Sequence, residues 1–354
     1  MAVEPESLEW SLPVPSVQEL AIQGLQTVPP RYVRDDTDII ITAPSDPSLR
    51  IPLIDMTKLV NPDSHEQEIQ RLHSACKEWG LFQIINHGVS DESLSKMKEQ
   101  VQGFFDLPLQ EKKRWAQKPG SIEGYGQVFV TSEEQKLEWN DMIFLRNIRS
   151  LQNRNLNFWP ENPPEFRKAL ETYSEEMNRV AVSIVRFMAM GLGLEAQQYS
   201  ETYREGVYHM RITCYPPCPE PERVSGLKSH TDINGITLLL ECGDMAGLQV
   251  LKDGHWVVVE PINGALVVNL GHVAQIMSNG IYKAPDHRVV ANKWKQRLSI
   301  ATFCFPNSSV DIGPAEKLIK SGSPPLFKTL KLEEYFHRYF NRKLHDSFID
   351  SLKI

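Results

Sequence analysis

The sequence predicts an α+β protein in which helices surround a β core built from two sheets. Two patterns carry this prediction. In the first two hundred or so residues, apolar side chains recur at helical spacing in several segments. From about residue 205, short runs rich in β-branched and aromatic residues alternate with turn residues roughly every ten positions, which is typical of a sandwich or barrel. A chain of 354 residues is long enough to bury a large core of this kind.

The N-terminal region is expected to open with an irregular arm. Residues 1–50 are rich in Pro, Asp and Ser and contain one short amphipathic segment, "VQELAIQGL", that predicts a helix. "IPLIDM" (51–56) and the apolar run "LFQIINH" (81–87) predict buried strands. The residues between them, at about 64–79, predict a helix.

Two further helices follow from caps and periodicity. Ser90 is a suitable N-cap, and the acidic residues after it favour the first turn of a helix. The apolar residues of this helix are Leu94, Met97, Val101, Phe104 and Phe105. A longer helix is expected to begin after "ENPP", with Pro163 in its first turn, and to end near Gly191 and Gly193. Its apolar stripe, which we expect in the core, is Phe166, Leu170, Tyr173, Met177, Val180, Ile184 and Met188.

The C-terminal half is expected to hold the β core. The predicted strands are "YHMRITCY", "GITLLLE", "GLQVL", "HWVVVEP", "GALVVNLG", "HRVVA" and "RLSIATFCF". The segment "LKLEEYFHRYFNRKL" then predicts a helix near the C-terminus. These patterns divide the chain into a mostly helical region with some core strands (1–204), the β core (205–310) and a helical tail that closes the domain (311–354).

Composition excludes several classes of partner. The formal net charge of −7 argues against a nucleic acid or an anionic membrane as partner, because both require clustered positive charge. No apolar run approaches the roughly 18 residues that a membrane span requires. The acidic, Pro-interrupted start lacks the features of a secretory signal, and the five cysteines form no CxxC pair. We therefore expect a cytoplasmic protein with reduced thiols, a small-molecule partner and no obligate assembly, and thus a monomer.

The stretch "GLKSHTDING" contains the first candidate metal ligands. His230 and Asp232 are two positions apart, so on a strand both side chains point to the same face. Chance alone supplies about one such doublet in a chain of this composition, so a hairpin with an incidental histidine is the alternative. Two histidines and one carboxylate form the facial triad of non-haem Fe(II) oxygenases, although these ligand types do not by themselves select iron over manganese or cobalt.

A third ligand would have to come from another strand. His287, in "KAPDHRVVA", lies in a β-like run, with 54 residues between it and Asp232. The alternative is that His287 is a hydrogen-bonded core histidine. His272, in "NLGHVAQ", is the main rival because it lies at a predicted strand-to-helix junction within the β region.

Two predicted strands carry polar and aromatic side chains on a single face. On "RLSIATFCF" these residues are Arg297, Ser299, Ala301, Phe303 and Phe305, and on "HMRITCY" they are His209, Arg211, Thr213 and Tyr215. Inside a barrel, the guanidinium of Arg297 and the hydroxyl of Ser299 can hold a carboxylate. The alternative is that both strands turn their polar faces to water.

With these residues assembled, the chain resembles the plant 2-oxoglutarate- and Fe(II)-dependent dioxygenases. The resemblance rests on the order "YPPCPEPE", "HTD", "HRVV" and "RLS", and it extends from "VPSVQEL" through "ACKEWGLFQIINHGV" to "FIDSLKI". The branch that contains norcoclaurine-synthase-like proteins and opiate O-demethylases, which act on specialised metabolites, is the most similar. The resemblance implies a double-stranded β-helix (jelly roll) with flanking helices.

The resemblance also implies roles for individual residues. His230, Asp232 and His287 would bind Fe(II). Arg297 and Ser299 would hold the distal carboxylate of 2-oxoglutarate, with help from Tyr215 and Thr213. The residues implied for the substrate pocket are Met142, Phe144, Arg211, Phe303 and Phe305.

The implied reaction is hydroxylation or O-demethylation of a largely apolar specialised metabolite, aromatic compounds included. It would consume O2 and 2-oxoglutarate, release succinate and CO2, and use ascorbate as reductant. Two other functions remain open: an iron oxidase that does not use 2-oxoglutarate, and a non-catalytic protein that keeps the fold to bind a small molecule. The sequence departs from its relatives at Thr213-Cys214, where Asn-Tyr is usual, at His272, where Asp is common, and at Met142, where a flavonoid-oxidising relative has Tyr.

Overall fold

The computed structural model describes residues 11–34, 49–320, 323–343 and 346–354. The described part of the arm contains the short helix expected there, α1 (Val17–Ile22). Ser16 caps this helix, and the buried carboxylate of Asp141 accepts hydrogen bonds from the backbone N–H groups of Val17 and Gln18. The remainder of the arm that the sequence predicts as irregular, residues 1–10 and 35–48, lies outside the described residues.

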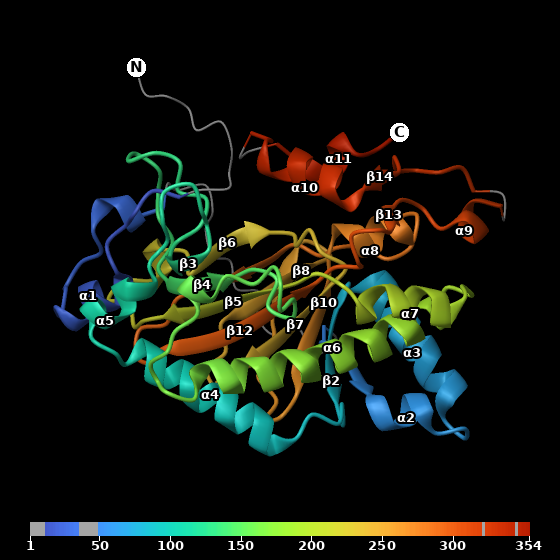
Figure 1. The fold of residues 1–354 in the computed structure, drawn as a ribbon, viewed down its shortest axis with the longest axis horizontal. Helices are drawn as coiled ribbons and strands as arrows, with labels where there is room; N and C mark the ends of the chain where they lie inside the picture. Colours follow the sequence, from blue (N-terminus) through green and yellow to red (C-terminus); the bar gives the residue numbers. More distant parts are fainter. Residues whose placement is uncertain (1–10, 35–48, 321–322, 344–345) are drawn as a thin grey trace.

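A large eight-stranded sheet forms the centre of the protein (Figure 1). Its strands, in spatial order, are β1 (Leu53–Asp55), β2 (Leu81–Ile85), β10 (Leu266–Leu270), β7 (Ile236–Glu241), β12 (Arg297–Cys304), β5 (Tyr208–Tyr215), β4 (Asp141–Leu145) and β3 (Gly124–Gly126). Only β1 and β2 pair in parallel; every other pairing is antiparallel. The four central strands therefore come from the C-terminal half of the chain, and strands from the N-terminal half lie at both edges of the sheet.

A second sheet covers one face of the first. Its strands, in spatial order, are β6 (Leu227–His230), β11 (His287–Val289), β8 (Leu248–Lys252) and β9 (His255–Val258). Apolar residues of both sheets, among them Tyr215, Leu239, Val250 and Val289, pack together between them. The double-sheet core predicted from the turn spacing is confirmed, and its form is a jelly roll with flanking helices.

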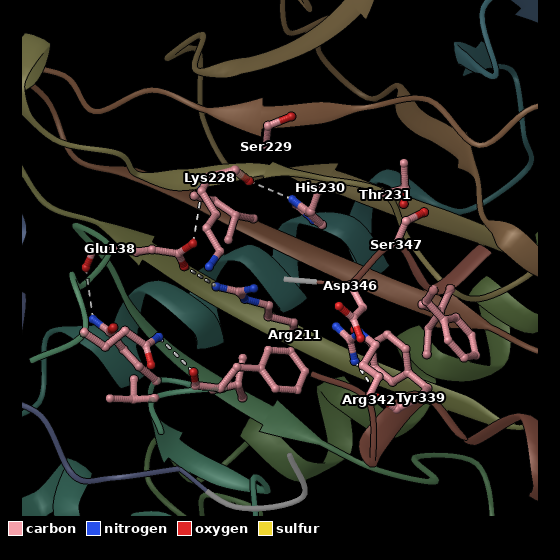
Figure 2. A pocket seen from close by; sticks show the side chains of 18 of the residues that line it. Glu138, Arg211, Lys228, Ser229, His230, Thr231, Tyr339, Arg342, Asp346 and Ser347 are labelled. Atoms are coloured by element: carbon pink, nitrogen blue, oxygen red, sulfur yellow. Dashed lines mark hydrogen bonds and ion pairs between the residues drawn. The ribbon is translucent and has the colours of Figure 1, made fainter. Parts of the chain in front are cut away.

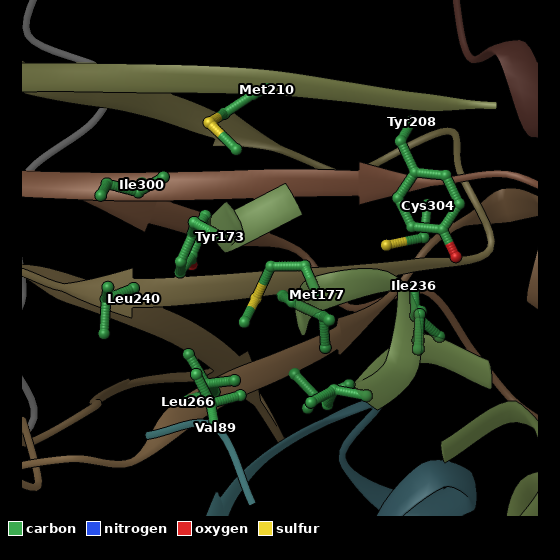
Figure 3. Close-up of a cluster of buried hydrophobic side chains, with 14 of the residues drawn as sticks. Val89, Tyr173, Met177, Tyr208, Met210, Ile236, Leu240, Leu266, Ile300 and Cys304 are labelled. Carbon is green, nitrogen blue, oxygen red and sulfur yellow. The ribbon is translucent and has the colours of Figure 1, made fainter. Parts of the chain in front are cut away.

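Helices cover the other face of the large sheet. The main ones are α3 (His65–Glu78), α4 (Asp91–Phe105) and α6 (Phe166–Gly191). Figure 3 shows Tyr173 and Met177 of α6 lying against Met210, Leu240 and Ile300 of the sheet. All seven residues of the stripe predicted for this helix are buried. The alternation of strand residues thus separates a helix-covered apolar face from the face that lines the jelly roll.

Shorter helices connect these elements. They are α2 (Met56–Val60), α5 (Leu109–Lys112), α7 (Ala196–Arg204), α8 (His272–Met277), α9 (Glu316–Lys320), α10 (Leu332–Phe340) and α11 (Phe348–Ser351). Single 3-10 turns occur at Pro30–Tyr32, Lys113–Trp115, Leu156–Phe158 and Pro221–Arg223, and a small sheet pairs β13 (Asp311–Ile312) with β14 (Leu330–Lys331). Within the described residues, no helix is long and apolar enough to cross a membrane.

The C-terminal tail lies on the opposite side of the β core from α4 (Figure 1). Its apolar residues pack against α8 and against Phe305 at the end of β12. The Tyr335 hydroxyl on α10 donates a hydrogen bond of 2.7 Å to the backbone carbonyl of Ile233. Because Ile233 follows Asp232, the predicted helical tail is tied directly to the loop that carries a candidate ligand.

Local details differ from the sequence prediction at several places. The long helix begins at Phe166, after Glu165 at its N-cap, so Pro163 lies in the preceding turn and not in the helix. The strand at 51–56 ends at Asp55, whose carboxylate caps α2 by accepting from the Thr57 N–H. Strands β3 and β4 were not predicted, because "GYG" and "DMIFL" are short and show no clear alternation.

Candidate active site

Two strands of the small sheet bring the candidate metal ligands together. His230 ends β6 and lies opposite His287, which begins β11. Asp232 follows in the loop between β6 and β7. Its Oδ1 lies 3.6 Å from Nε2 of His230 and 3.7 Å from Nε2 of His287, and the three ligand atoms all lie within 4.8 Å of one another. Antiparallel pairing therefore converts two distant segments into one compact donor set.

Hydrogen bonds orient the three side chains. The Nδ1 atoms of His230 and His287 lie 2.9 and 3.1 Å from the backbone carbonyls of Lys228 and Pro285. A carbonyl only accepts, so each Nδ1 carries the hydrogen and each Nε2 keeps its lone pair for a metal. Asp232 Oδ2 accepts hydrogen bonds from Thr237 and Asn269, which leaves Oδ1 facing the histidines.

The loop that holds Asp232 is fixed from behind by α8. The backbone N–H groups of His272 and Val273 donate to the carbonyls of Asp232 and Asn234, at 2.8 and 3.1 Å. Gly271 makes this approach possible, because a Cβ there would lie 2.2 Å from the Asn234 carbonyl oxygen. A tight backbone contact thus sets the position of the carboxylate.

The protonation states suit metal binding. Burial, with a smaller contribution from His287, lowers the pKa of His230 to about 3, so its imidazole is neutral. Burial alone would raise the pKa of Asp232, but the two histidines and the hydrogen bonds from Thr237 and Asn269 outweigh it and lower the pKa. Neutral imidazoles and an ionised carboxylate are the forms that bind a divalent metal.

His272, the rival ligand, is placed outside this donor set. Among the described residues, the one group of His, Cys, Asp or Glu atoms close enough to share a metal ion is His230, Asp232 and His287. His272 begins α8, and its Nε2 lies 2.7 Å from the Thr231 hydroxyl. Burial lowers the pKa of His272 to about 4. Its position in the fold is that of a buried, hydrogen-bonded neighbour of the site.

A narrow hollow runs from the triad to Arg297, between the two sheets. Arg297 is 4% exposed, and its Nη2 forms an ion pair of 2.5 Å with Oε1 of Glu241 on the neighbouring strand. Within the described chain, Nε and Nη1 of Arg297 and Oε2 of Glu241 have no hydrogen-bond partner. Buried donors without partners are unfavourable, and a carboxylate entering this hollow would satisfy them.

Neighbouring residues shape the same hollow. The Arg297 guanidinium lies over the Tyr215 ring, 5.0 Å from its centre, and Ser299 is two residues further along the same face. Burial works to lower the pKa of Arg297, but Glu241 and Tyr215 raise it, so the guanidinium stays charged. Thr213 pairs with Ser299 across the sheet and also lines the hollow. The residues present therefore fit a small dicarboxylate between Arg297 and a metal at the triad.

An aromatic chamber of about 120 Å³ opens on the other side of the triad. Its wall includes the rings of Phe129, Phe144, Phe303, Phe305, Phe336 and Tyr339. The three phenylalanines expected from the sequence at 144, 303 and 305 all line it. Phe336 and Tyr339, on α10, were missed as site residues, although the repeated aromatic residues of "LEEYFHRYF" indicated an apolar face.

Met142 does not reach this chamber. It lies on the lumen side of β4, opposite Thr213, but it is fully buried and lines neither the chamber nor the hollow that leads to Arg297. Phe144, two residues further along, takes the position at the chamber wall. The structure thus does not support the expectation that Met142 contacts the substrate.

A wider vestibule of about 290 Å³ leads from the surface to the triad (Figure 2). Figure 2 shows Glu138 and Arg211 reaching toward each other beside His230, with Nη2 of Arg211 3.9 Å from Oε2 of Glu138. Arg211 also lines the chamber and the hollow, so it stands where all three spaces meet. Arg342 and Asp346 from the C-terminal tail form the opposite side.

Comparison with protein families places this site in a known context. Residues 51–162 match the model described as the N-terminal region of non-haem dioxygenases in morphine synthesis, and residues 206–306 match the 2OG-Fe(II) oxygenase superfamily. The second match contains the triad, Arg297 and Ser299.

Individual relatives agree over nearly the whole chain. The oxoglutarate-dependent flavonoid 7-O-demethylase 1 of Ocimum basilicum is 42% identical, covering 99% of this chain and 94% of the relative. S-norcoclaurine synthase 1 of Coptis japonica is 44% identical, with 97% of each chain covered, and codeine O-demethylase of Papaver somniferum is 38% identical, also with 97% of each covered. The crystal structure of JOX2 in complex with 2OG, Fe and JA is 33% identical, with a TM-score of 0.86 over 98% of this chain and 99% of that one.

Proposed function

Because the chain belongs to the 2OG-Fe(II) oxygenase superfamily, we propose that it hydroxylates or O-demethylates an aromatic specialised metabolite. The protein is an enzyme that uses Fe(II), 2-oxoglutarate and O2. The observation that carries the proposal is the arrangement of two spaces around one triad: a polar hollow that ends at Arg297 and an aromatic chamber on the other side. Ascorbate would serve as reductant.

The proposal assigns each residue of the site to Fe(II) or to 2-oxoglutarate. His230, Asp232 and His287 would hold Fe(II) through two Nε2 atoms and Oδ1. Arg297 and Ser299 would bind the distal carboxylate of 2-oxoglutarate, while Tyr215 packs against the guanidinium and Thr213 lines the wall. The bound metal, O2 and 2-oxoglutarate would together supply an oxidant that converts a substrate C–H bond to C–OH, with one oxygen atom of O2 entering the product, the other entering succinate, and release of CO2.

The chain's own contribution is to orient the substrate and to exclude water. The aromatic wall favours a flat, apolar ring in the chamber, because burying such surface releases water from both partners. Arg211 and Glu138 at the mouth offer opposite charges to the polar end of the substrate. A ring carbon held toward the triad would be hydroxylated, and a methoxy carbon held there would be oxidised and lost as formaldehyde.

Relatives support this choice of substrate class. Similar proteins include O-demethylases that are named for a flavonoid, for codeine and for thebaine. Because these names give three different substrates, they support a class of reaction and not any single compound.

An untargeted metabolite screen tests the proposed function. Purified enzyme with Fe(II), ascorbate and O2 is incubated with plant extracts, with and without 2-oxoglutarate. We expect a metabolite to gain one oxygen atom or to lose one CH2 unit only when 2-oxoglutarate is present, together with an equal amount of succinate. Oxidation that proceeds without 2-oxoglutarate, and without succinate, would instead identify an oxidase.

Replacing Thr237 by valine is expected to weaken Fe(II) binding by about 10- to 100-fold, because partners that orient a ligating carboxylate contribute on this scale. The substitution keeps the side-chain volume and removes the hydrogen bond to Asp232 Oδ2 and the one that Thr237 accepts from Asn234 Nδ2. An anaerobic Fe(II) titration measures the effect. Because Asn269 still holds Oδ2 and Asn234 Nδ2 still donates to the Ile236 carbonyl, the metal-free protein should unfold at nearly the same temperature as wild type. Unchanged Fe(II) affinity would contradict the prediction.

Replacing Glu241 by glutamine is expected to tighten 2-oxoglutarate binding by at least about threefold, because a nearby negative charge disfavours a second carboxylate. Glutamine keeps the size and still offers an oxygen to Arg297 Nη2. The KM for 2-oxoglutarate and its anaerobic Kd should both fall. If both rise instead, Glu241 acts mainly by positioning Arg297.

We also propose that the enzyme acts as a monomer in the cytoplasm. One chain supplies every described residue of the hollow, the chamber and the vestibule. All five cysteines are unpaired, as expected in a reducing compartment. Light scattering of the purified protein and imaging of a fluorescent fusion test the two statements separately.

A further inference from the structure

His209 is a polar side chain in the aromatic chamber to which the proposed function gives no role. It lies on β5, and its cross-strand neighbour on β12 is Phe303. Its ring packs among those of Phe144, Phe305 and Phe336, with centroids 6.0, 5.6 and 6.1 Å away. It is only 8% exposed and lines the chamber. An imidazole in such surroundings needs a physical explanation, since an aromatic or aliphatic residue would fill the space equally well.

The position of the hydrogen on this imidazole follows from one contact. The backbone N–H of Asn147 donates to Nδ1 of His209 over 3.1 Å. Because an N–H group only donates, Nδ1 is the acceptor and the ring hydrogen resides on Nε2. Burial, followed by the nearby Arg146, lowers the pKa of His209 to about 3, against a smaller opposing effect of the Tyr208 backbone. The ring is therefore neutral at physiological pH and offers a single N–H donor.

That donor has no side-chain acceptor within the described part of the chain. Besides the Asn147 N–H at Nδ1, the hydrogen bonding of the ring involves the Tyr208 backbone, and the neighbouring rings are hydrocarbon. Of the other polar side chains of the chamber, Arg146 and Arg211 only donate, whereas Thr231 Oγ1 lies 2.7 Å from His272 Nε2 and Asn234 Oδ1 accepts from the Thr237 hydroxyl. The carboxylate of Asp232 is already engaged by Thr237 and Asn269. A substrate oxygen in the chamber would therefore give Nε2–H an acceptor that no described side chain provides.

We propose that His209 is a specificity-determining residue: its Nε2–H binds an oxygen atom on the ring that enters the aromatic chamber. The oxygen is an ether, hydroxyl or carbonyl oxygen, which neutral imidazole recognises and which hydrocarbon walls do not. This inference rests on the proposed function and narrows it, because it selects oxygenated aromatic rings over plain ones. It also orients the ring, since one fixed hydrogen bond beside a flat aromatic wall defines which ring edge faces the triad.

Two matched probes test the inference. 2-Methoxynaphthalene and 2-ethylnaphthalene have nearly the same shape and differ by an ether oxygen in place of a CH2 group. Their Kd values are measured with enzyme that carries Fe(II) and 2-oxoglutarate under anaerobic conditions. The measured quantity is the Kd of the ethyl probe divided by the Kd of the methoxy probe. We expect this ratio to be about 3- to 10-fold larger for wild type than for a variant without the N–H donor, because one neutral hydrogen bond contributes on this scale.

Two substitutions isolate the donor. His209→Phe keeps a ring in the chamber and removes the N–H, so the preference for the methoxy probe should disappear while the ethyl probe binds as before or better. His209→Gln places an amide N–H close to the position of Nε2 and should restore the preference. Binding of Fe(II) and 2-oxoglutarate, measured in the same samples, verifies that each variant is folded.

The outcomes separate this inference from the proposed function. Equal discrimination by wild type and His209→Phe, or no binding of either probe to wild type, would overturn the role of His209. The proposed function is tested by 2-oxoglutarate-dependent oxidation of a metabolite with release of succinate, which does not depend on the probes. An enzyme that oxidises its metabolite but ignores the probe oxygen would keep its function and lose this assignment.

Discussion

Replacing Asp232 by alanine is expected to lower Fe(II) affinity by more than about 100-fold and to abolish succinate formation. Loss of a partner that only orients a ligand already costs about 10- to 100-fold, and loss of the ligand itself costs more. Asp232 is also the one anionic member of the donor set, and it lies within 3.7 Å of both histidines. An anaerobic Fe(II) titration measures the affinity, and the metal-to-ligand absorption band that forms with 2-oxoglutarate reports the assembled site.

A control variant distinguishes loss of the site from loss of any histidine or acid. His255→Ala changes an exposed histidine on β9 in the same small sheet and should bind Fe(II) as wild type does. Asp232→Ala should remain folded, because the substitution removes a buried charge along with two hydrogen bonds. Retention of tight Fe(II) binding by the alanine variant would refute the assignment of the triad.

The side-chain faces of the lumen strands could be predicted from the sequence, because successive residues of a strand point to opposite faces. Alternation along β5 assigned Arg211, Thr213 and Tyr215 to one face, and all three line the hollow. The opposite residues, Met210, Ile212 and Cys214, are in the helix-covered core. A period of two residues is a local property of the backbone, so sequence alone determines it once a segment is a strand.

The partners across the sheets could not be predicted in the same way. Glu241 meets Arg297 because β7 pairs with β12 in one particular register, which brings together residues 56 positions apart. Nothing in "GITLLLE" indicates that its last residue is a buried acid. The walls from α10 were missed for a related reason: periodicity shows that Phe336 and Tyr339 belong to a helix, but not which surface that helix covers.

Met142 illustrates the limit of transferring a position from relatives. Its side chain is on the lumen face of β4, since it pairs with Thr213. The position along the strand decides what a side chain contacts, and Met142 is fully buried and lines neither the hollow nor the chamber. Phe144, one step further along the same face, meets the open chamber. Depth within a barrel depends on packing that a single strand does not encode.

Replacing Arg297 by leucine is expected to raise the Kd for 2-oxoglutarate by more than about 100-fold, because a buried charged hydrogen-bond partner contributes about 2–5 kcal/mol. The single variant also leaves the buried Glu241 carboxylate without its ion-pair partner, because that carboxylate pairs with Arg297 at 2.5 Å. Breaking one side of a buried ion pair typically costs about 3–5 kcal/mol of stability. Weak 2-oxoglutarate binding by the Arg297→Leu variant alone would therefore not show whether the variant had lost its cosubstrate site or its fold.

The double variant Arg297→Leu/Glu241→Gln separates these effects. It removes both charges together, so its free energy of unfolding should lie closer to that of wild type than the single variant's does. Fe(II) affinity without 2-oxoglutarate should be unchanged, because no contact joins Arg297 to the triad. The Kd for 2-oxoglutarate should remain raised by more than about 100-fold, whereas Arg204→Leu, which removes an exposed ion pair on α7, should bind it normally. A stable double variant that still binds 2-oxoglutarate tightly would show that the cosubstrate carboxylate is held elsewhere.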